Sequence, residues 1–328
     1  MSNPYLDLLQ LELQARNNSR ENFSYYMRFV NPQYDQQWFH KLIADKCQEL
    51  YEGKIKKLMI FLPPQHGKAL KHDTPILTTT GFKNHSELQI GDIVFNQKGE
   101  QVKVLANTGV YEWDCMNVEF AGGYSLTASV NHEWNCYIPN SDHKSIYHER
   151  IETQSIATKT KDRSPYIEVS KPLIYDEKNL LIPPYILGIW LGDGRSCGKQ
   201  ICENKEDGQK FIDTHGFTIK RSKDNVYYLN HESLNCTKLK AIGVFDNKHI
   251  PFEYLTASIE QRTELLNGLM DTDGYCDPRG NCEIVQVRER ISYEIYLLIQ
   301  SLGYKPSISV SDAKINGVKK SLKYRITF

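Results

Sequence analysis

The sequence predicts an α+β protein made of several domains, and three observations support this fold class. Apolar residues recur at three- and four-residue spacing up to about residue 53, which is typical of helices. From residue 69 to about residue 172, short alternating runs separated by glycine turns indicate a β-rich region. Farther on, two similar apolar segments end near Asp193 and Asp273, 80 residues apart, which indicates a duplicated domain. At roughly 150 residues per domain, 328 residues are enough for two or three domains.

The composition excludes several classes of protein. Hydrophobic residues make up 40% and charged residues 24%, so the chain is neither disordered nor collagen-like. It lacks an apolar run of the ~20 residues that a membrane helix needs, and it lacks a signal peptide, so we expect a cytoplasmic protein without a membrane partner. Basic and acidic residues both number 40, so any contact with nucleic acid must come from a local patch. The eight cysteines contain no CxxC pair and are expected to be free thiols.

The first pattern in the sequence predicts helix up to about Gly53. The short apolar run KLMIFL at 57–62 follows and is typical of a buried strand. The sequence PPQHGK follows at 63–68, and a strand, a glycine turn and a lysine together suggest a phosphate-binding loop. Such a loop needs Ser or Thr after the lysine to bind Mg²⁺, but the next residue is Ala69. On spacing alone, a simple turn after a strand is favoured.

The segment 25–68 resembles the start of the ATPase domain of phage terminase large subunits, whose loop has the pattern Pro-Pro-x-His-Gly-Lys followed by Ser or Thr. The resemblance implies that residues 1–68 are the N-terminal part (N-extein) of a phage or prophage protein that works in the host cytoplasm. It implies that Gly67 and Lys68 contact ATP only in the spliced, full-length host protein. The hydroxyl residue and the acidic strand of the ATPase are missing, so this chain is expected not to hydrolyse ATP, and an insertion after Lys68 is implied.

The residues that follow resemble the N-terminal blocks of inteins, which have the Hint fold. The matching stretches are ALKHDTPILTTTGF at 69–82, LQIGDIVF at 88–95 and GGYSLTASVNHEW at 122–134. The resemblance implies an all-β Hint splicing domain over residues 69–175. It also implies that His132 donates to the scissile amide and that Ser129, three residues earlier, helps to hold the strained bond.

Ala69 departs from the intein pattern, because most inteins begin with Cys or Ser, which attacks the preceding carbonyl. Three interpretations remain: an engineered replacement of Cys, an alanine-first intein, or a third class in which an internal Cys attacks. We favour the third class because Trp134 follows His132 by two residues, although Trp134 could equally be a core aromatic. The final intein blocks, with a Cys, a penultimate His and a terminal Asn, are missing, and Cys276 and Cys282 lie too early to serve. We therefore expect a C-terminally truncated intein that cannot complete splicing.

The segments YILGIWLG at 185–192 and ELLNGLMD at 264–271 resemble the two helices of LAGLIDADG, or dodecapeptide, homing endonucleases, which lie inside many inteins. The resemblance implies a duplicated αββαββ domain over residues 181–328, incomplete at its C-terminus, that acts as a monomer with a pseudo-twofold axis. Gly188 and Gly268 would let the two helices pack closely. Each helix would then present one carboxylate, Asp193 or Asp273, to a shared Mg²⁺ site that cleaves double-stranded DNA.

The resemblance to LAGLIDADG homing endonucleases also suggests roles for several further residues. Asp271 is expected to be a helix cap, because its counterpart in the first motif is Leu191. Lys248 is a candidate for the basic residue near the scissile phosphate, and a surface lysine is the alternative. Six further basic residues are candidates for phosphate contacts, with generic surface charge as the alternative: Arg195, Arg288, Arg290, Lys319, Lys320 and Arg325.

The sequence therefore predicts an intein-containing terminase fragment with a metal-dependent homing endonuclease. One alternative is a DNA-packaging ATPase, which an intact acidic strand would support. The other is a DNA-binding relic whose aspartate pair no longer cleaves.

Overall fold

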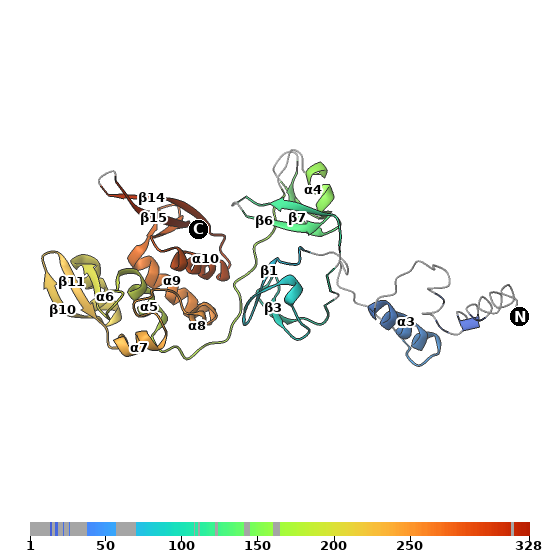
Figure 1. Cartoon of the computed structure of the whole chain (residues 1–328), viewed down its shortest axis with the longest axis horizontal. Coiled ribbons are helices and arrows are strands. Elements are labelled where there is room, and N and C mark those ends of the chain that lie inside the picture. Colours follow the sequence, from blue (N-terminus) through green and yellow to red (C-terminus); the bar gives the residue numbers. More distant parts are fainter. Residues whose placement is uncertain are drawn as a thin grey trace, which may run out of the picture. The chain divides into compact units, whose positions relative to one another are not determined.

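The computed structural model describes most of the chain after residue 69 and part of it before (Figure 1). Residue contacts divide the chain into two units, Met1–Gly67 and Lys68–Phe328. The expected strand at 57–62, the phosphate loop with Gly67 and Lys68, and Ala69 lie outside the described residues. The described residues are 14, 17–18, 22, 26, 38–56, 70–107, 109–110, 112–121, 124–140, 145–159, 165–315 and 318–328.

In the first unit, the helix expected before Gly53 is present as α3, Trp38–Tyr51. Gly53 follows with a φ of 71°, a left-handed conformation that glycine adopts without strain, so the helix ends where expected. Within the described part of both units, no helix has the length and apolar character needed to cross a bilayer.

The second unit begins with a β-rich region of small antiparallel sheets. The four short strands β1 to β4 form one sheet in the order β2-β1-β3-β4, and two separate hairpins follow. The elements are β1 (Pro75–Thr78), β2 (Gly81–Asn84), η1 (His85–Glu87), β3 (Ile93–Phe95), β4 (Gln101–Lys103), β5 (Cys115–Glu119), β6 (Ser125–Ser129), β7 (Glu133–Pro139), β8 (Ile146–Glu152) and α4 (Thr153–Lys159). A small core joins the two hairpins, made of Ala128, Trp134, Cys136, Ile138 and Ile151.

The remainder of the second unit is a mixed α/β region with two halves of similar order, but only the second has the expected αββαββ order, because the first half has an isolated bridge at Gly194 in place of a strand. The first half contains α5 (Pro184–Asp193), β9 (Ile201–Asn204), α6 (Lys205–His215), β10 (Thr218–Lys223) and β11 (Val226–Asn230). After α7 (Cys236–Ala241) and α8 (Phe252–Leu255), the second half contains α9 (Ile259–Asp273), β12 (Gly274–Cys276), β13 (Cys282–Gln286), α10 (Glu289–Ser301), β14 (Ser307–Ile315) and β15 (Val318–Thr327). The sheets have the orders β10-β11-β9 and β12-β13-β15-β14.

Strand register shows that the two halves are equivalent residue by residue. In the first half Gly194 pairs with Ile201, which pairs with Leu229. In the second half Gly274 pairs with Ile284, which pairs with Ile326. The residue that precedes each glycine is the last of its helix, which makes Asp193 and Asp273 equivalent positions.

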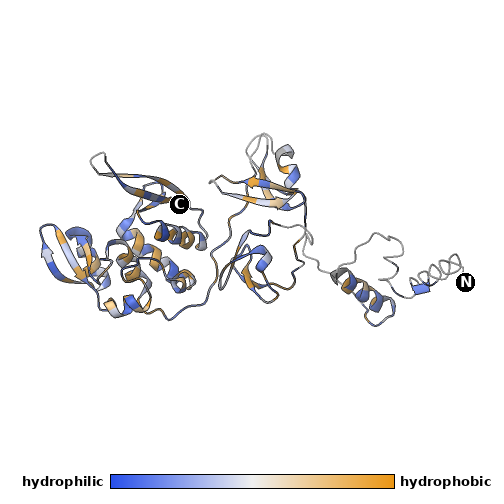
Figure 2. Ribbon diagram, viewed as in Figure 1, coloured by the Kyte–Doolittle hydropathy of each residue, from blue (hydrophilic) through white to orange (hydrophobic). Residues whose placement is uncertain are grey.

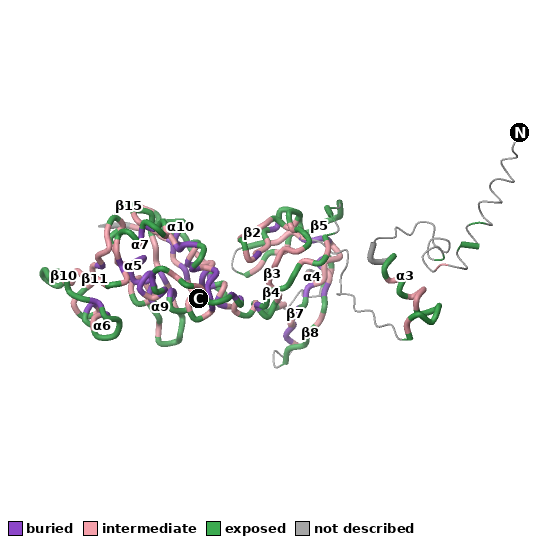
Figure 3. The backbone as a smooth tube through the Cα atoms, turned by 90° about the horizontal axis from the view of Figure 1, so that it is seen from below, coloured by how far each residue is buried: buried purple, intermediate pink, exposed green. Residues whose placement is uncertain are grey.

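The helices α5 and α9 form the centre of this region. Helix α5 is apolar on all sides and largely buried, as is typical of a helix in the interior of a domain, and Pro184 begins it. Buried residues concentrate in α5, α9 and α10 (Figure 3), and the ribbon of these helices carries many hydrophobic residues (Figure 2).

Glycines allow α5 and α9 to approach each other as closely as the sequence predicts. A Cβ atom at Gly188 would lie 2.4 Å from the carbonyl oxygen of Leu265, and one at Gly268 would lie 2.2 Å from that of Tyr185. Both distances are far inside van der Waals contact, so any side chain at either position would force the helices apart.

The extended segment from Lys171 to Lys178, which we call the strap, joins the β-rich region to the helices. On one side the N–H groups of Lys171 and Ile174 donate to the carbonyl oxygens of Gln97 and Gly99, at 2.9 and 2.8 Å. On the other side, Leu173 N–H donates to the carbonyl of Ser301 at 2.9 Å. The strap is therefore hydrogen-bonded to both regions at once.

A fully buried arginine holds the strap against α9. The Arg262 guanidinium donates to the carbonyl oxygens of Leu173 and Ser301 and to the Ser301 hydroxyl, and its Nε donates to the carbonyl of Ala257 at 2.9 Å. It also lies over the ring of Tyr175, 5.3 Å from the centroid. Burial lowers the pKa of Arg262 to about 10, so the side chain stays charged at neutral pH and all its bonds to the main chain are charge-assisted.

Replacing Arg262 with methionine is expected to lower the free energy of unfolding by about 2–4 kcal/mol, because several buried carbonyl oxygens lose their donor together. Chemical denaturation measures the loss, and limited proteolysis should then cut the strap first. The matched control is Arg290→Met, since Arg290 is exposed and forms only a surface pair with Glu294. Equal unfolding midpoints for the two variants would contradict the role of Arg262 in holding the strap against α9.

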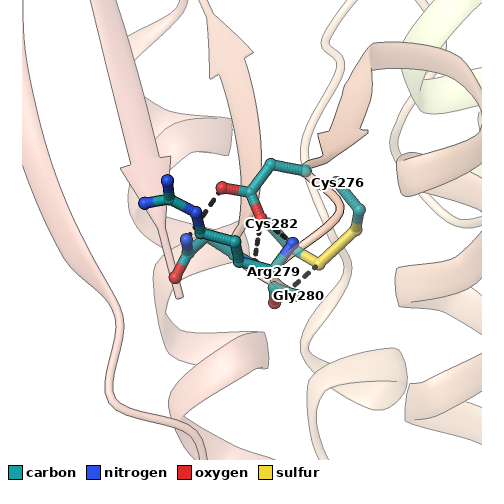
Figure 4. Close-up of a disulfide and its surroundings, with 6 residues drawn as sticks. Cys276, Arg279, Gly280 and Cys282 are labelled. Atoms are coloured by element: carbon teal, nitrogen blue, oxygen red, sulfur yellow. Dashed lines mark hydrogen bonds between the residues drawn. A yellow bond between two sulfur atoms is a disulfide. The ribbon is translucent and has the colours of Figure 1, made fainter.

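The expectation that all cysteines are free thiols is wrong for one pair. Cys276 and Cys282 form a disulfide across the β12–β13 hairpin (Figure 4). The reason is register: the antiparallel pairing puts these two residues directly opposite each other, with Cα atoms 4.2 Å apart. The other six cysteines, all within the described residues, are free.

Candidate active site

The two helix-terminal aspartates lie next to each other at the base of the helix pair. A Cβ atom at Gly192 would lie 2.1 Å from Thr272 Oγ1 and 3.3 Å from Asp273 Oδ2, so the ends of α5 and α9 are in contact. Both carboxyl groups are partly buried. Burial is the main cause that raises the pKa of Asp193 to about 7, and burial followed by the charge of Asp193 also raises the pKa of Asp273.

Each aspartate has a hydrogen-bonded neighbour that the sequence motifs did not indicate. Glu203 shares a hydrogen bond with Asp193, and its charge also contributes to the raised pKa of that residue. The Gln286 side-chain amide donates to Asp273 Oδ2. Glu203 pairs with Tyr227 and Gln286 pairs with Tyr324, each two residues after the equivalent isoleucine, so Glu203 and Gln286 occupy equivalent places in the two halves.

A cavity of about 300 Å³ opens beside Asp273. Residues from both halves line it: Leu191, Gly192, Gly194, Ser196, Lys248, Asp273, Val285, Gln286, Val287, Arg288 and Ile291. The cavity thus combines one carboxylate, one amide and two basic side chains at the end of the helix pair.

Lys248 lies in this cavity and not on the open surface. Its Nζ donates to the carbonyl oxygens of Leu191 and Gly192 at 2.9 and 2.8 Å, and it lies over the Trp190 ring, 5.3 Å from the centroid. Burial, followed by the nearby charge of Arg288, lowers the pKa of Lys248 to about 8. The side chain is therefore a positioned cation that caps the C-terminal carbonyls of α5.

The other predicted polar contacts are only partly reproduced. Asp271 does not cap α9: its carboxylate accepts a 2.6 Å hydrogen bond from the Tyr185 hydroxyl of α5, because the two helices are packed side by side. Among the six basic residues, Arg288 lines the cavity, while three form surface ion pairs with acidic neighbours: Arg290 with Glu294, Lys319 with Asp312 and Arg325 with Glu283.

The donor set at the helix ends suits a divalent cation. No group of three or more His, Cys, Asp or Glu residues with metal-site geometry occurs within the described residues. Glu203 shares a hydrogen bond with Asp193, and the charge of Asp193 raises the pKa of Asp273, so these carboxylates lie near one another pair by pair in a partly buried place. A Mg²⁺ ion prefers oxygen ligands and commonly takes only one or two carboxylates, so these residues fit it.

A second cluster of predicted residues lies in the β-rich region. The turn after β6 brings Ser129 and His132 together, since His132 N–H donates to the Ser129 carbonyl at 2.9 Å. The Trp134 ring packs edge-on against the His132 ring at 4.8 Å between centroids, and it is also a core residue. Leu70, the second residue after the expected junction, forms a β-bridge with Ala128, which directly precedes Ser129.

The Ser129 hydroxyl is buried and accepts or donates no hydrogen bond within the described part of the chain. An unmet buried hydroxyl is costly unless a further group contacts it, and the chain at residue 70 enters directly beside it.

Comparison with known proteins supports the endonuclease part of this arrangement. Residues 249–328 match the family model described as homing endonuclease, which supports a homing endonuclease in this part of the chain. This range includes Asp273 and Gln286.

Two similar proteins are replicative DNA helicases DnaB of mycobacteria. The chain is 30% identical over 292 residues to the one from Mycobacterium intracellulare, a match that covers 83% of this chain and 49% of that protein. It is 30% identical over 86 residues to the one from Mycobacterium leprae, which covers 26% of this chain and 14% of that protein. The chain thus spans about half the length of the first relative and less of the second.

Proposed function

We propose that the chain is an intein of the Hint fold that carries a LAGLIDADG-type homing endonuclease, and that the endonuclease cuts double-stranded DNA with Mg²⁺. The observation that carries the proposal is the equivalence of Asp193 and Asp273 at the touching ends of two packed helices. One carboxylate from each half, at one pseudo-symmetric place, suits the cleavage of two antiparallel strands. The endonuclease would act as a monomer.

Each residue of the site then has a chemical role. Asp193 and Asp273 would hold Mg²⁺, with Glu203 hydrogen-bonded to Asp193, and the ion would stabilise the attacking and leaving oxygens of the phosphodiester. Lys248 and Arg288 would place positive charge against the scissile phosphate. Gln286 fixes the orientation of Asp273 by its hydrogen bond.

The exposed strands supply surfaces for the DNA backbone. Strand β10 is exposed along its whole length and carries Lys220, Arg221 and Lys223. Arg221 lies over the ring of its partner Tyr228 on the neighbouring strand β11, 5.7 Å from the centroid. Because the net charge of the chain is zero, DNA binding needs a local basic patch, and the basic residues of β10 would supply one.

For splicing, we propose that His132 donates to the scissile amide after Lys68, with Ser129 beside it, and that the intein belongs to the third class. The packing of Trp134 on His132 supports this class, although the same residue serves the core.

The host protein is proposed to be a terminase on the Pro-Pro-x-His-Gly-Lys loop, with Gly67 and Lys68 contacting ATP only after splicing, in the cytoplasm of the host cell. The helicase similarity covers 83% of the chain, so most of it must fall beyond residue 68. A shared insert accounts only for the part beyond residue 68: 83% of 328 residues is about 272, more than the 260 residues that follow Lys68, so the similarity also reaches into residues 1–68. A packaging ATPase or a cleavage-dead DNA-binding relic remains the alternative.

A cleavage assay tests the proposal on plasmids that carry the uninterrupted host sequence around the Gly67 and Lys68 codons. Cleavage is expected with Mg²⁺ and absent with a chelator. Because Asp193 must lose its proton to bind the cation, and its pKa is about 7, the Mg²⁺ concentration for half-maximal rate should rise about tenfold per pH unit below pH 7. Binding of the plasmid without any cleavage or nicking between pH 7 and 9 would favour the relic.

A further inference from the structure

Thr153, the first residue of α4, contacts two of the splicing residues at once. Its main-chain N–H donates to the His132 carbonyl at 2.8 Å, and its hydroxyl donates to the same oxygen at 3.1 Å. The hydroxyl also accepts a 3.0 Å hydrogen bond from the Trp134 indole N–H. Thr153 is only 3% exposed, so all three hydrogen bonds form in a largely buried place where they are strong.

The bonds of Thr153 follow from the β7–β8 register. Glu133 lies opposite Glu152 and Trp134 opposite Ile151, so the next residue, Thr153, lies opposite His132. Its neighbour Gln154 donates from the main chain to the Val130 carbonyl at 3.0 Å. The start of α4 therefore holds the whole turn from Ser129 to His132 from outside.

We propose that Thr153 is a positioning residue of the splicing site, acting through His132 and Trp134. It fixes the backbone of His132 directly, and it fixes the ring of His132 through the indole that packs edge-on against it. One hydroxyl is used as donor and as acceptor, which neither valine nor alanine can reproduce and serine can. The proposal rests on the proposed splicing function, but the positioning itself is measured separately.

The isosteric pair Thr153→Val and Thr153→Ser tests the positioning in the full chain. In Thr153→Val, the Trp134 indole N–H loses its acceptor, so its hydrogen exchange should become about tenfold faster and its NMR signal should shift upfield. The ring signals of His132, assigned with His132→Gln, should shift as well. Thr153→Ser should resemble the parent protein in both. Circular dichroism checks that both variants fold, and the serine variant keeps the test valid if the valine variant does not.

A second measurement tests the chemistry, in a chain where Ala69→Cys supplies a nucleophile. The introduced thiolate attacks the Lys68 carbonyl carbon, a C–S bond forms, the C–N bond to residue 69 breaks, and the amine takes a proton. Dithiothreitol then attacks the thioester and releases residues 1–68, restoring the introduced thiol. Thr153→Val should slow this release at least about tenfold, and Thr153→Ser should change it by less than about threefold.

The outcomes separate the two proposals. Unchanged Trp134 and His132 signals in a folded Thr153→Val chain overturn the positioning role of Thr153. Equal release rates from Thr153→Val and its parent, where the parent does release residues 1–68, overturn it as well. If the Ala69→Cys parent itself releases nothing, a nucleophile at residue 69 does not attack the Lys68 carbonyl, so the replaced-Cys interpretation is wrong and the third class is the remaining route, while the spectroscopic result still decides whether Thr153 positions the two rings.

Discussion

Replacing Asp193 or Asp273 with asparagine is expected to reduce DNA cleavage on the order of 10³-fold, because each change removes an anionic ligand worth several kcal/mol of charge stabilisation. Asparagine keeps the shape of the side chain, so the helix pair should stay folded. DNA binding should survive or become tighter, since a negative group that faces phosphate is lost.

The matched control for these variants is Asp271→Asn. Asp271 is on the same helix as Asp273, two residues earlier, but its carboxylate binds the Tyr185 hydroxyl and does not line the cavity. Strand-specific labelling measures the cleavage of each strand, and a gel-shift assay measures binding. If the two asparagine variants cut as fast as the control, the assignment of the aspartate pair is wrong.

Replacing Gly188 or Gly268 with alanine is expected to lower the free energy of unfolding by about 3 kcal/mol or more in each case. The direction of the change in the free energy of unfolding is informative. Alanine is a better helix former than glycine, so without the helix contact each replacement would add about 0.5–1 kcal/mol of stability. The new methyl group would lie within 2.4 Å of a main-chain oxygen of the partner helix in both variants, and backbone cannot move aside as a side chain can.

The neighbouring residue Asn267 provides the control, since Asn267→Ala changes an exposed position of the same helix. Chemical denaturation gives the free energies. The double glycine variant should cost less than the sum of the singles, because both changes open the same helix contact. A gain of stability in either single variant would mean that α5 and α9 do not pack through these glycines.

The parts of the site that recur in sequence could be predicted, and the parts fixed by register could not. Asp193 and Asp273 follow similar apolar helices, so the repeat itself identifies them. Glu203 lies 10 residues after the first aspartate and Gln286 lies 13 residues after the second, because the hairpin turn of the second half is longer. Only the pairing of the strands shows that these two residues are equivalent.

Other contacts were beyond sequence reasoning for the same reason. Thr153 is 21 residues from His132, and no local pattern relates them. Arg262 looks like an ordinary polar position of a helix, yet its partners come from segments 89 and 39 residues away. The Cys276–Cys282 pair was missed because its signal is a short hairpin turn and not a CxxC spacing. The phosphate-loop residues Gly67 and Lys68, and Ala69, stay predictions.

The strap limits how such a chain can exchange parts during evolution. The main chain of Lys171 and Ile174 is hydrogen-bonded to the β3–β4 turn, whereas the main chain of Leu173 is hydrogen-bonded to α10 and to Arg262. Neighbouring residues of one short segment therefore contact two different regions. A recombination breakpoint inside the strap would leave buried carbonyl groups without their hydrogen-bond donors in both recombinant proteins. Viable chimaeras are therefore those that inherit the strap together with the surfaces on both of its sides, so that the two regions diverge as one heritable block.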